Sequence, residues 1–90
     1  MKKIIVADDE ARIRRLVCDF LKKEGYEPLE ADDGDIAFEL FKENPDTALM
    51  IVDIMMPNMD GWSLCKEIRK FSTVPIILLT ARSQEFDELM

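Results

Sequence analysis

Acidic side chains follow two short apolar segments of the sequence, at the points where buried strands would end. Asp8, Asp9 and Glu10 come directly after the first apolar segment, and Asp53 comes after the third. Ligands of an open parallel sheet bind outside the carboxyl ends of its strands. If the first and third strands are neighbours, three aspartates meet there, and a cation or a proton must relieve their repulsion. Oxygen ligands of this kind favour Mg²⁺.

Each of these residues also has a purely structural interpretation. An Asp-Asp-Glu segment often opens a helix, with Asp9 as the capping residue and the acids complementing the helix dipole. Asp53 could cap the following turn, although a carboxylate after the apolar residues 50–52 would be costly to bury without a partner. Thr80, which ends the fourth apolar segment, is typical of a strand residue. All of these residues would lie at the carboxyl ends of strands in one sheet, and this shared position favours a functional site.

The elements that would position these residues follow from a hydrophobic period that changes along the chain. Four short apolar segments predict strands, at residues 2–7, 26–31, 49–52 and 74–79. Three segments with helical spacing lie between them, and a fourth helix would open at Ser83. In the first helix the stripe predicted to be buried consists of Ile13, Leu16, Val17, Phe20 and Leu21. Gly25 is its expected C-terminal cap.

Strand and helix alternate throughout the chain. The second helix would open at Asp33 and Gly34 and end before Asn44. Pro28 has no backbone N–H for strand pairing, so the second strand is expected at an edge of the sheet. This order predicts an α/β fold with a doubly wound parallel sheet, because right-handed crossovers place helices on both faces.

The composition excludes several classes of protein. The 90 residues are enough for one domain. The chain has no histidine, so it cannot supply a Ser-His or Cys-His triad or a histidine-containing zinc site. Its net charge of −7 disfavours binding to nucleic acid or to an anionic membrane. Cys18 and Cys65 form no CxxC pair, and the first apolar segment is too short for a signal peptide, so a reducing, cytoplasmic location is expected.

A longer pattern joins these features. Asp8-Asp9-Glu10, the loop Asp-x-x-Met-Pro-x-x-Asp-Gly over residues 53–61, and Thr80 with the alanine after it together resemble the receiver domain of two-component response regulators. The resemblance covers the whole chain. The segment Thr-Ala-Arg that begins at Thr80 is most similar to regulators with a winged-helix DNA-binding output domain, which implies an output in transcription.

The resemblance implies a chemical role for each of these positions. Asp53 would accept a phosphoryl group from a sensor histidine kinase and form an aspartyl phosphate. Asp8, Asp9, Asp53 and the backbone carbonyl of Met55 would hold Mg²⁺. Thr80 would be the switch hydroxyl that moves toward a phosphoryl oxygen. The domain would then act as a phosphoacceptor switch and not as a turnover enzyme.

The resemblance also implies structural and partner roles. Pro57 and Gly61 would shape the loop after the third strand. In the family the first helix docks on the kinase, so Arg12 and Arg15 are candidates for contact with it. The alternative for these two arginines is a solvated helix face.

Two other functions stay open at this point. One is a receiver fragment that is inactive or acts only by binding. The other is a magnesium-dependent phosphatase with Asp53 as its nucleophile. Such phosphatases place a second acid two residues after the nucleophile, and Met55 at that position argues against this function.

The fold implied by the resemblance is flavodoxin-like, with five strands in the order 2-1-3-4-5. Residues 1–90 are therefore expected to form a single receiver domain that is incomplete at its C-terminus. The expected sheet order is 2-1-3-4, with the fifth strand and the fifth helix missing. A fourth strand without that neighbour would expose backbone donors and acceptors, so we expect copies of the truncated chain to associate as a homo-oligomer.

Overall fold

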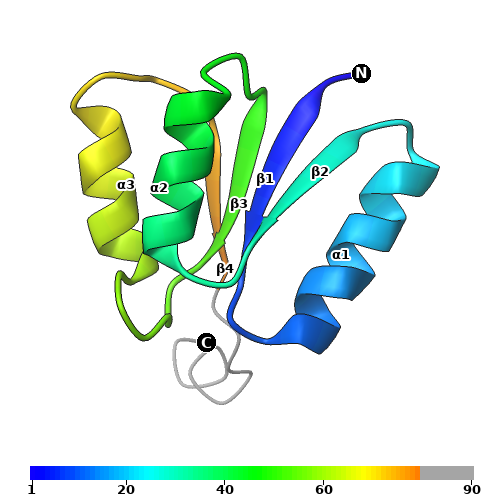
Figure 1. Ribbon diagram of the computed structural model, residues 1–90, viewed down its shortest axis with the longest axis horizontal. Coiled ribbons are helices and arrows are strands. Elements are labelled where there is room, and N and C mark those ends of the chain that lie inside the picture. The colour runs from blue at the N-terminus through cyan, green and yellow to red at the C-terminus, as the bar shows by residue number, and fades with distance from the viewer. Residues whose placement is uncertain (80–90) are drawn as a thin grey trace, which may run out of the picture.

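The computed structural model of the chain describes residues 1–79, so the expectations for Thr80 and for a helix opening at Ser83 lie outside the described residues. Strands and helices alternate along these residues (Figure 1). The elements are β1 (Lys3–Ala7), α1 (Ala11–Lys23), β2 (Glu27–Ala31), α2 (Gly34–Glu43), β3 (Leu49–Asp53), α3 (Gly61–Arg69) and β4 (Ile76–Leu79). Each predicted strand and each of the first three predicted helices is present.

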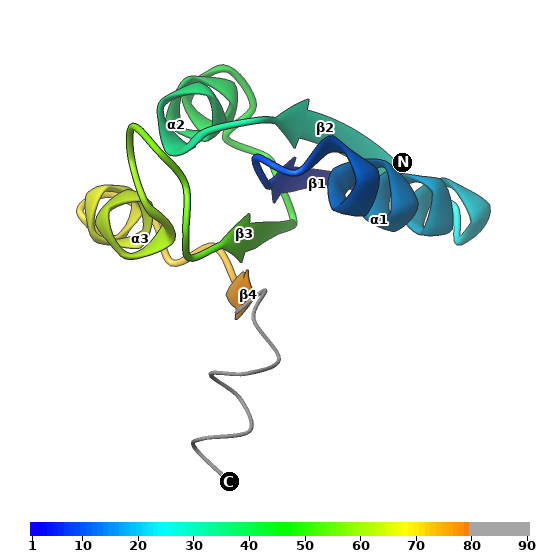
Figure 2. The ribbon, with the colours of Figure 1, turned by 90° about the horizontal axis from the view of Figure 1, so that it is seen from below.

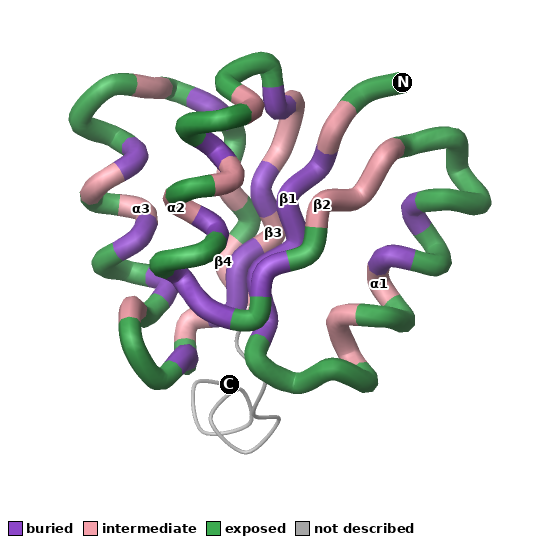
Figure 3. Tube along the Cα trace, viewed as in Figure 1, coloured by how far each residue is buried: buried purple, intermediate pink, exposed green. Residues whose placement is uncertain are grey.

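The four strands form one parallel sheet in the order β2-β1-β3-β4, which confirms the predicted order. Pro28 lies in β2, at an edge of the sheet and beside Ile4 of β1, so its missing N–H costs no ladder bond between two inner strands. The central strands β1 and β3 are the most buried elements (Figure 3). Of the described strands, β4 forms the other edge, and association of copies through it stays a prediction.

Helices cover both faces of the sheet, as the alternation predicts (Figure 2). Successive side chains of a strand point to opposite faces. On one face, Ile5 and Met50 pack with residues of α2 and α3, among them Phe41 and Leu64. On the other face the core is smaller and consists of Ile4, Val6, Cys18 and Leu21, with Val17, Leu49 and Ile51 packed against it.

The predicted buried stripe of α1 is partly wrong. Leu21 is buried and Val17 packs against the core, but Leu16 and Phe20 are 71% and 62% exposed. The helix packs mainly on β1 and β2, so the sheet covers one row of its side chains. Within residues 1–79, α1 is the only helix on this face of the sheet, and the part of the stripe that turns away from the sheet has nothing to pack against.

Some predicted boundaries shift by one or two residues. Strands β1 and β2 begin one residue later than predicted, and α1 begins at Ala11. Strand β4 begins at Ile76 and not at Val74, because the Val74 N–H is bonded to the Ser72 hydroxyl and Pro75 has no N–H to donate. The proline carbonyl still accepts from the N–H of Met50.

The C-terminus of α1 has the predicted glycine. Gly25 has φ +89°, the left-handed backbone that glycine adopts without a steric cost. Its N–H donates to the carbonyl of Lys22, and the N–H of Tyr26 donates to that of Leu21, which is a Schellman motif. Within the described residues, no helix is long and apolar enough to cross a membrane.

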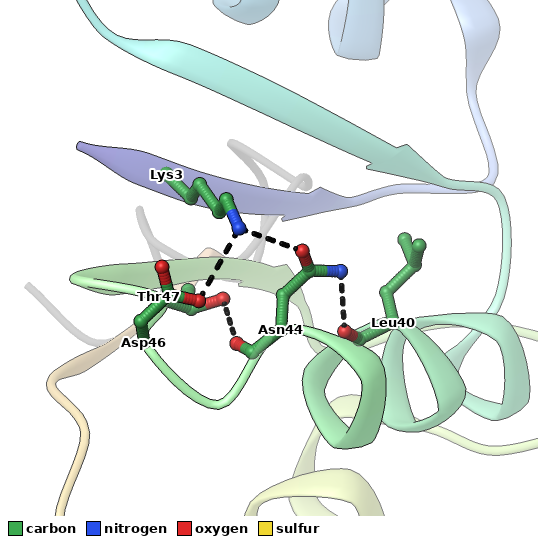
Figure 4. Close-up of polar contacts among 5 residues, drawn as sticks. All are labelled: Lys3, Leu40, Asn44, Asp46 and Thr47. Carbon is green, nitrogen blue, oxygen red and sulfur yellow. Dashed lines mark hydrogen bonds and ion pairs between the residues drawn. The ribbon is translucent and has the colours of Figure 1, made fainter. Parts of the chain in front are cut away.

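At the amino ends of the strands, side chains tie the end of α2 to β1 (Figure 4). Lys3 Nζ donates to Asn44 Oδ1 at 3.0 Å and to Asp46 Oδ1 at 3.3 Å. Asn44 Nδ2 donates to the Leu40 carbonyl at 3.0 Å, and the Thr47 hydroxyl donates to the Asn44 carbonyl at 2.6 Å. This network lies at the amino ends of the strands, whereas Asp8 and Asp53 lie at their carboxyl ends.

The Asn44→Ala variant should lower the free energy of unfolding by about 1–2 kcal/mol, because it removes two hydrogen bonds of a partly buried network. Urea denaturation measures the change. Asp46→Ala is the control, since the Lys3–Asp46 ion pair is exposed and should contribute less than about 1 kcal/mol. Equal losses of unfolding free energy in Asn44→Ala and Asp46→Ala would contradict the stabilising role of the Asn44 hydrogen bonds.

Candidate functional site

Three carboxylates meet where β1 and β3 end. One carboxylate oxygen each of Asp8, Asp9 and Asp53 lies within 4.8 Å of the other two. The strands are neighbours with Ala7 beside Val52, so the residues that follow emerge at the same level of the sheet. Asp8 and Asp53 are each only 2% exposed, whereas Asp9 is exposed. The structure therefore brings together the three aspartates that strand order predicted to converge.

Hydrogen bonds hold the segment after β1 in place. The Asp8 carboxylate accepts from the N–H of Glu10 at 2.9 Å, and the Asp8 N–H donates to the carbonyl of Ala31 in β2. Arg14 of α1 donates from Nη1 to the Asp8 carbonyl at 2.7 Å and from Nε to Glu30 at 3.0 Å. Arg14 therefore links the start of α1, the end of β1 and strand β2.

The capping interpretation of Asp9 is wrong. The N-cap residue of α1 is Glu10, and its side chain makes no capping hydrogen bond. The backbone N–H of Glu10 instead donates to the carboxylate of Asp8. Asp9 instead lines an open pocket together with Asp53, which fits a ligand better than a cap.

The environment of Asp53 opposes its negative charge. Burial raises the pKa of its carboxyl group, and the nearby charges of Asp8 and Asp9 raise it further. The N–H of Met55, which donates to Asp53 Oδ1 at 3.1 Å, acts in the opposite direction without cancelling these effects. A cation would restore the charged form. The donor set fits Mg²⁺, because Mg²⁺ prefers hard oxygen ligands and binds through a few carboxylates.

The carboxylates open into a pocket of about 650 Å³. Its lining combines acids with apolar side chains: Asp9, Glu10, Asp53, Ile54, Met55, Met56, Pro57, Asp60 and Trp62. Trp62 is 59% exposed and was not identified from the sequence. Its position one residue after the Asp-Gly pair that opens α3 is the signal that could have placed it beside the pocket.

The loop from Asp53 to Gly61 is held at both ends. The Gly61 N–H donates to the Ile54 carbonyl at 2.9 Å, and a Cβ at Gly61 would lie 2.6 Å from the Asp53 carbonyl oxygen. Asp60 caps α3 by accepting from the N–H of Ser63 at 2.7 Å, and this hydrogen bond lowers the pKa of Asp60. Gly61 is therefore required by close backbone approach, since its φ is not positive.

The two arginines expected to contact a kinase lie on α1. Arg12 and Arg15 are exposed and line a shallow groove with Ile13 and Leu16. Glu10 lines both this groove and the carboxylate pocket, so the two are adjacent. Helix α1 begins on the side of the sheet where the strands end (Figure 1).

A doubly wound parallel sheet with a carboxylate cluster where its first and third strands end defines the receiver class of signalling domain. A family model agrees with this assignment, since the response regulator receiver domain matches residues 4–89. The chain belongs to the response regulator receiver domain family.

Curated relatives have the same region as part of a longer protein. The chain is 47% identical to a probable transcriptional regulator, ycf27, of Porphyridium aerugineum, over 98% of this chain and 36% of that protein. It is 48% identical to the ycf27 protein of Galdieria sulphuraria, over 98% of this chain and 34% of that protein. The chain thus spans about a third of the length of these relatives.

Solved structures of response regulators share the fold. The response regulator protein TrrA from Thermotoga maritima, in complex with Mg(2+)-BeF, matches with a TM-score of 0.85 and 42% identity, over 99% of this chain and 77% of that chain. A structure of the histidine kinase ThkA in complex with TrrA matches with a TM-score of 0.81 and 44% identity, over 90% of this chain and 70% of that chain.

Proposed function

We propose that this domain is a phosphoacceptor switch in which Asp53 receives a phosphoryl group from a histidine kinase in a Mg²⁺-dependent reaction. The observation that supports it most directly is a buried carboxylate at the end of a central strand, within 4.8 Å of two others and open to a pocket. Curated relatives that carry a matching region are named as probable transcriptional regulators, so we infer an output in transcription.

Asp53 is the nucleophile of the proposed transfer. An Asp53 oxygen attacks phosphorus, the bond from phosphorus to the donor breaks, and the donor leaves with the electron pair of that bond. The Met55 N–H holds Oδ1, which orients the carboxylate toward the pocket. Asp8, Asp9, Asp53 and the Met55 backbone carbonyl would hold Mg²⁺, which would offset the negative charge of these carboxylates and of the phosphoryl oxygens.

Two further roles complete the proposal. Thr80, outside the described residues, would supply the switch hydroxyl. Pro57 lines the pocket, and Gly61 allows α3 to start against the Asp53 carbonyl, so both shape the acceptor loop. The site has no second acid two residues after Asp53, which disfavours the alternative of a phosphatase.

Treatment with acetyl phosphate should add one phosphoryl group in Mg²⁺ and none in EDTA. Intact-mass spectrometry measures the addition, and borohydride trapping followed by peptide mapping locates it. We expect the label on Asp53, because this carboxylate is buried at the strand end and faces the pocket. Label on Asp8, Asp9 or another acid would overturn the assignment, and no incorporation would favour a domain that acts only by binding.

The kinase surface can be tested separately from the chemistry. The groove with Arg12 and Arg15 adjoins the carboxylate pocket, and we propose that a kinase contacts it. With phosphorylated ThkA as a probe donor, Arg12→Glu and Arg15→Glu should each slow transfer about tenfold, while labelling by acetyl phosphate should not change. Lys42→Glu, at an exposed position of α2, is the charge-matched control. Equal slowing by the control would contradict a specific surface.

A further inference from the structure

We propose that Asp33 is a positioning residue for the acceptor loop, residues 53–61, and thereby for the Mg²⁺ ligands at its start. The inference rests on the proposed function. From the sequence, Asp33 is only the residue that opens α2. In the structure it is 5% exposed, and its carboxylate bonds a segment that lies more than twenty residues further along the chain.

Both oxygens of the Asp33 carboxylate accept hydrogen bonds from backbone N–H groups. Oδ1 accepts from Gly34 at 2.6 Å and from Met59 at 2.9 Å, and Oδ2 accepts from Asn58 at 3.1 Å. The first of these bonds caps α2, whereas the other two belong to the acceptor loop. One side chain therefore joins the start of α2 to the middle of the loop.

Close packing supports the same junction. A Cβ at Gly34 would collide with the Met59 carbonyl oxygen and would lie 2.8 Å from the Met59 Cβ. Glycine thus lets the start of α2 approach the loop backbone closely enough for the carboxylate to reach it. Contacts between α2 and α3 continue this packing along both helices.

The Asp33 carboxylate is suited to a permanent structural role because it stays charged. Burial alone would raise its pKa, but the N–H groups of Met59, Asn58 and Gly34 together outweigh burial and lower it. Hydrogen bonds to a charged acceptor in a buried site are stronger than neutral ones. A charged Asp33 therefore holds the loop more firmly than a neutral side chain would.

The loop segment that Asp33 holds lies between two pockets. Pro57 lines the carboxylate pocket and also a smaller one that contains Asp33 and Asn58, and Asp9 borders both. In the middle of the loop Met56 is buried in the core and Met59 packs against it, whereas the other hydrogen bonds that hold the loop lie near its ends, between Gly61 and Ile54 and at the cap made by Asp60. The Asp33 carboxylate thus adds hydrogen bonds to this packing at Asn58 and Met59, between the Met55 carbonyl and α3.

Amide hydrogen exchange and Mg²⁺ titration of the purified protein test this role. Asp33→Ala should speed exchange at Asn58 and Met59 and weaken Mg²⁺ binding about tenfold, as loss of an outer support of a metal site does. Asp33→Asn should show an intermediate loss, because its amide oxygen still accepts at one position while its NH₂ group replaces Oδ2 opposite the Asn58 N–H.

Asn44→Ala is the matched control, since it destabilises the other end of α2 and leaves the loop alone. If Asp33→Ala matches this control in Mg²⁺ affinity and in loop exchange at equal loss of stability, the positioning role is wrong. If Mg²⁺ binding by the wild type is absent or does not change in Asp53→Asn, the proposed function fails and the inference fails with it. If the wild type binds Mg²⁺ and the Asp33 variants show unchanged Mg²⁺ affinity and loop exchange, the inference about Asp33 is wrong and the proposed function stands.

Discussion

The Asp53→Asn variant should be more stable than the wild type in metal-free buffer at neutral pH, and Mg²⁺ should no longer stabilise it. Asparagine has the same shape but removes a buried charge that lies beside those of Asp8 and Asp9. A gain of about 1 kcal/mol would raise the melting temperature by roughly 4–8 °C in a domain of this size. In the wild type, Mg²⁺ at about 100 times its dissociation constant should add about 2.7 kcal/mol.

The difference in stability between Asp53→Asn and the wild type should also depend on pH. The pKa of Asp53 is raised in the folded state, so the unfavourable contribution of its charge is present at pH values above that raised pKa. As the pH falls through the raised pKa toward the ordinary aspartate value of about 4, the carboxyl group takes up a proton and the penalty disappears. The stability difference between Asp53→Asn and the wild type should therefore narrow between neutral pH and about pH 4.

Thermal melts in EDTA and in millimolar Mg²⁺, with ionic strength matched by sodium chloride, measure both effects. Asn44→Ala is the control, because it removes two hydrogen bonds at the opposite end of α2 and should lower stability while the Mg²⁺-induced rise persists. Identical melting temperatures for the wild type with and without Mg²⁺ would refute the metal site. If Asp53→Asn is less stable than the wild type in EDTA, repulsion among the carboxylates of Asp8, Asp9 and Asp53 does not destabilise the fold as proposed.

The Gly61→Ala variant should lose on the order of 1–3 kcal/mol of stability, the typical range for overpacked sites. Its new methyl group would lie 2.6 Å from the Asp53 carbonyl oxygen and 2.9 Å from the Ile54 Cα, and neither backbone atom can move without displacing the end of β3. The small gain in helix propensity from alanine cannot offset this clash. Because the displaced residues include Asp53, Mg²⁺ affinity should also fall.

Gly25→Ala is the matched control for this prediction. It adds the same methyl group where nothing lies within 4 Å, and its cost comes only from the backbone at φ +89°. A loss of about 1–2 kcal/mol is expected for a non-glycine residue in that conformation. Urea denaturation and Mg²⁺ titration should show reduced stability in both variants and reduced affinity in Gly61→Ala alone. If Gly61→Ala is as stable as the wild type, the close approach of Gly61 to the Asp53 carbonyl is wrong.

Several features of this domain follow from the sequence because their causes are local. The change of hydrophobic period defines strands and helices within a few residues, and the glycine at position 25 ends α1 because only glycine adopts that backbone easily. Pro28 excludes β2 from the middle of the sheet, since it lacks a donor. Acids at the ends of two buried strands then define the candidate site once those strands are neighbours.

Other features depended on the tertiary structure, because they arise between segments that are distant in the sequence. The apolar period of α1 marks five residues, but the sheet beneath it decides that Leu21 is buried and Leu16 is exposed. No local pattern shows that the carboxylate of Asp33 meets the N–H groups of Asn58 and Met59. Local chemistry specifies the elements and their ends, and packing alone specifies which of those ends touch.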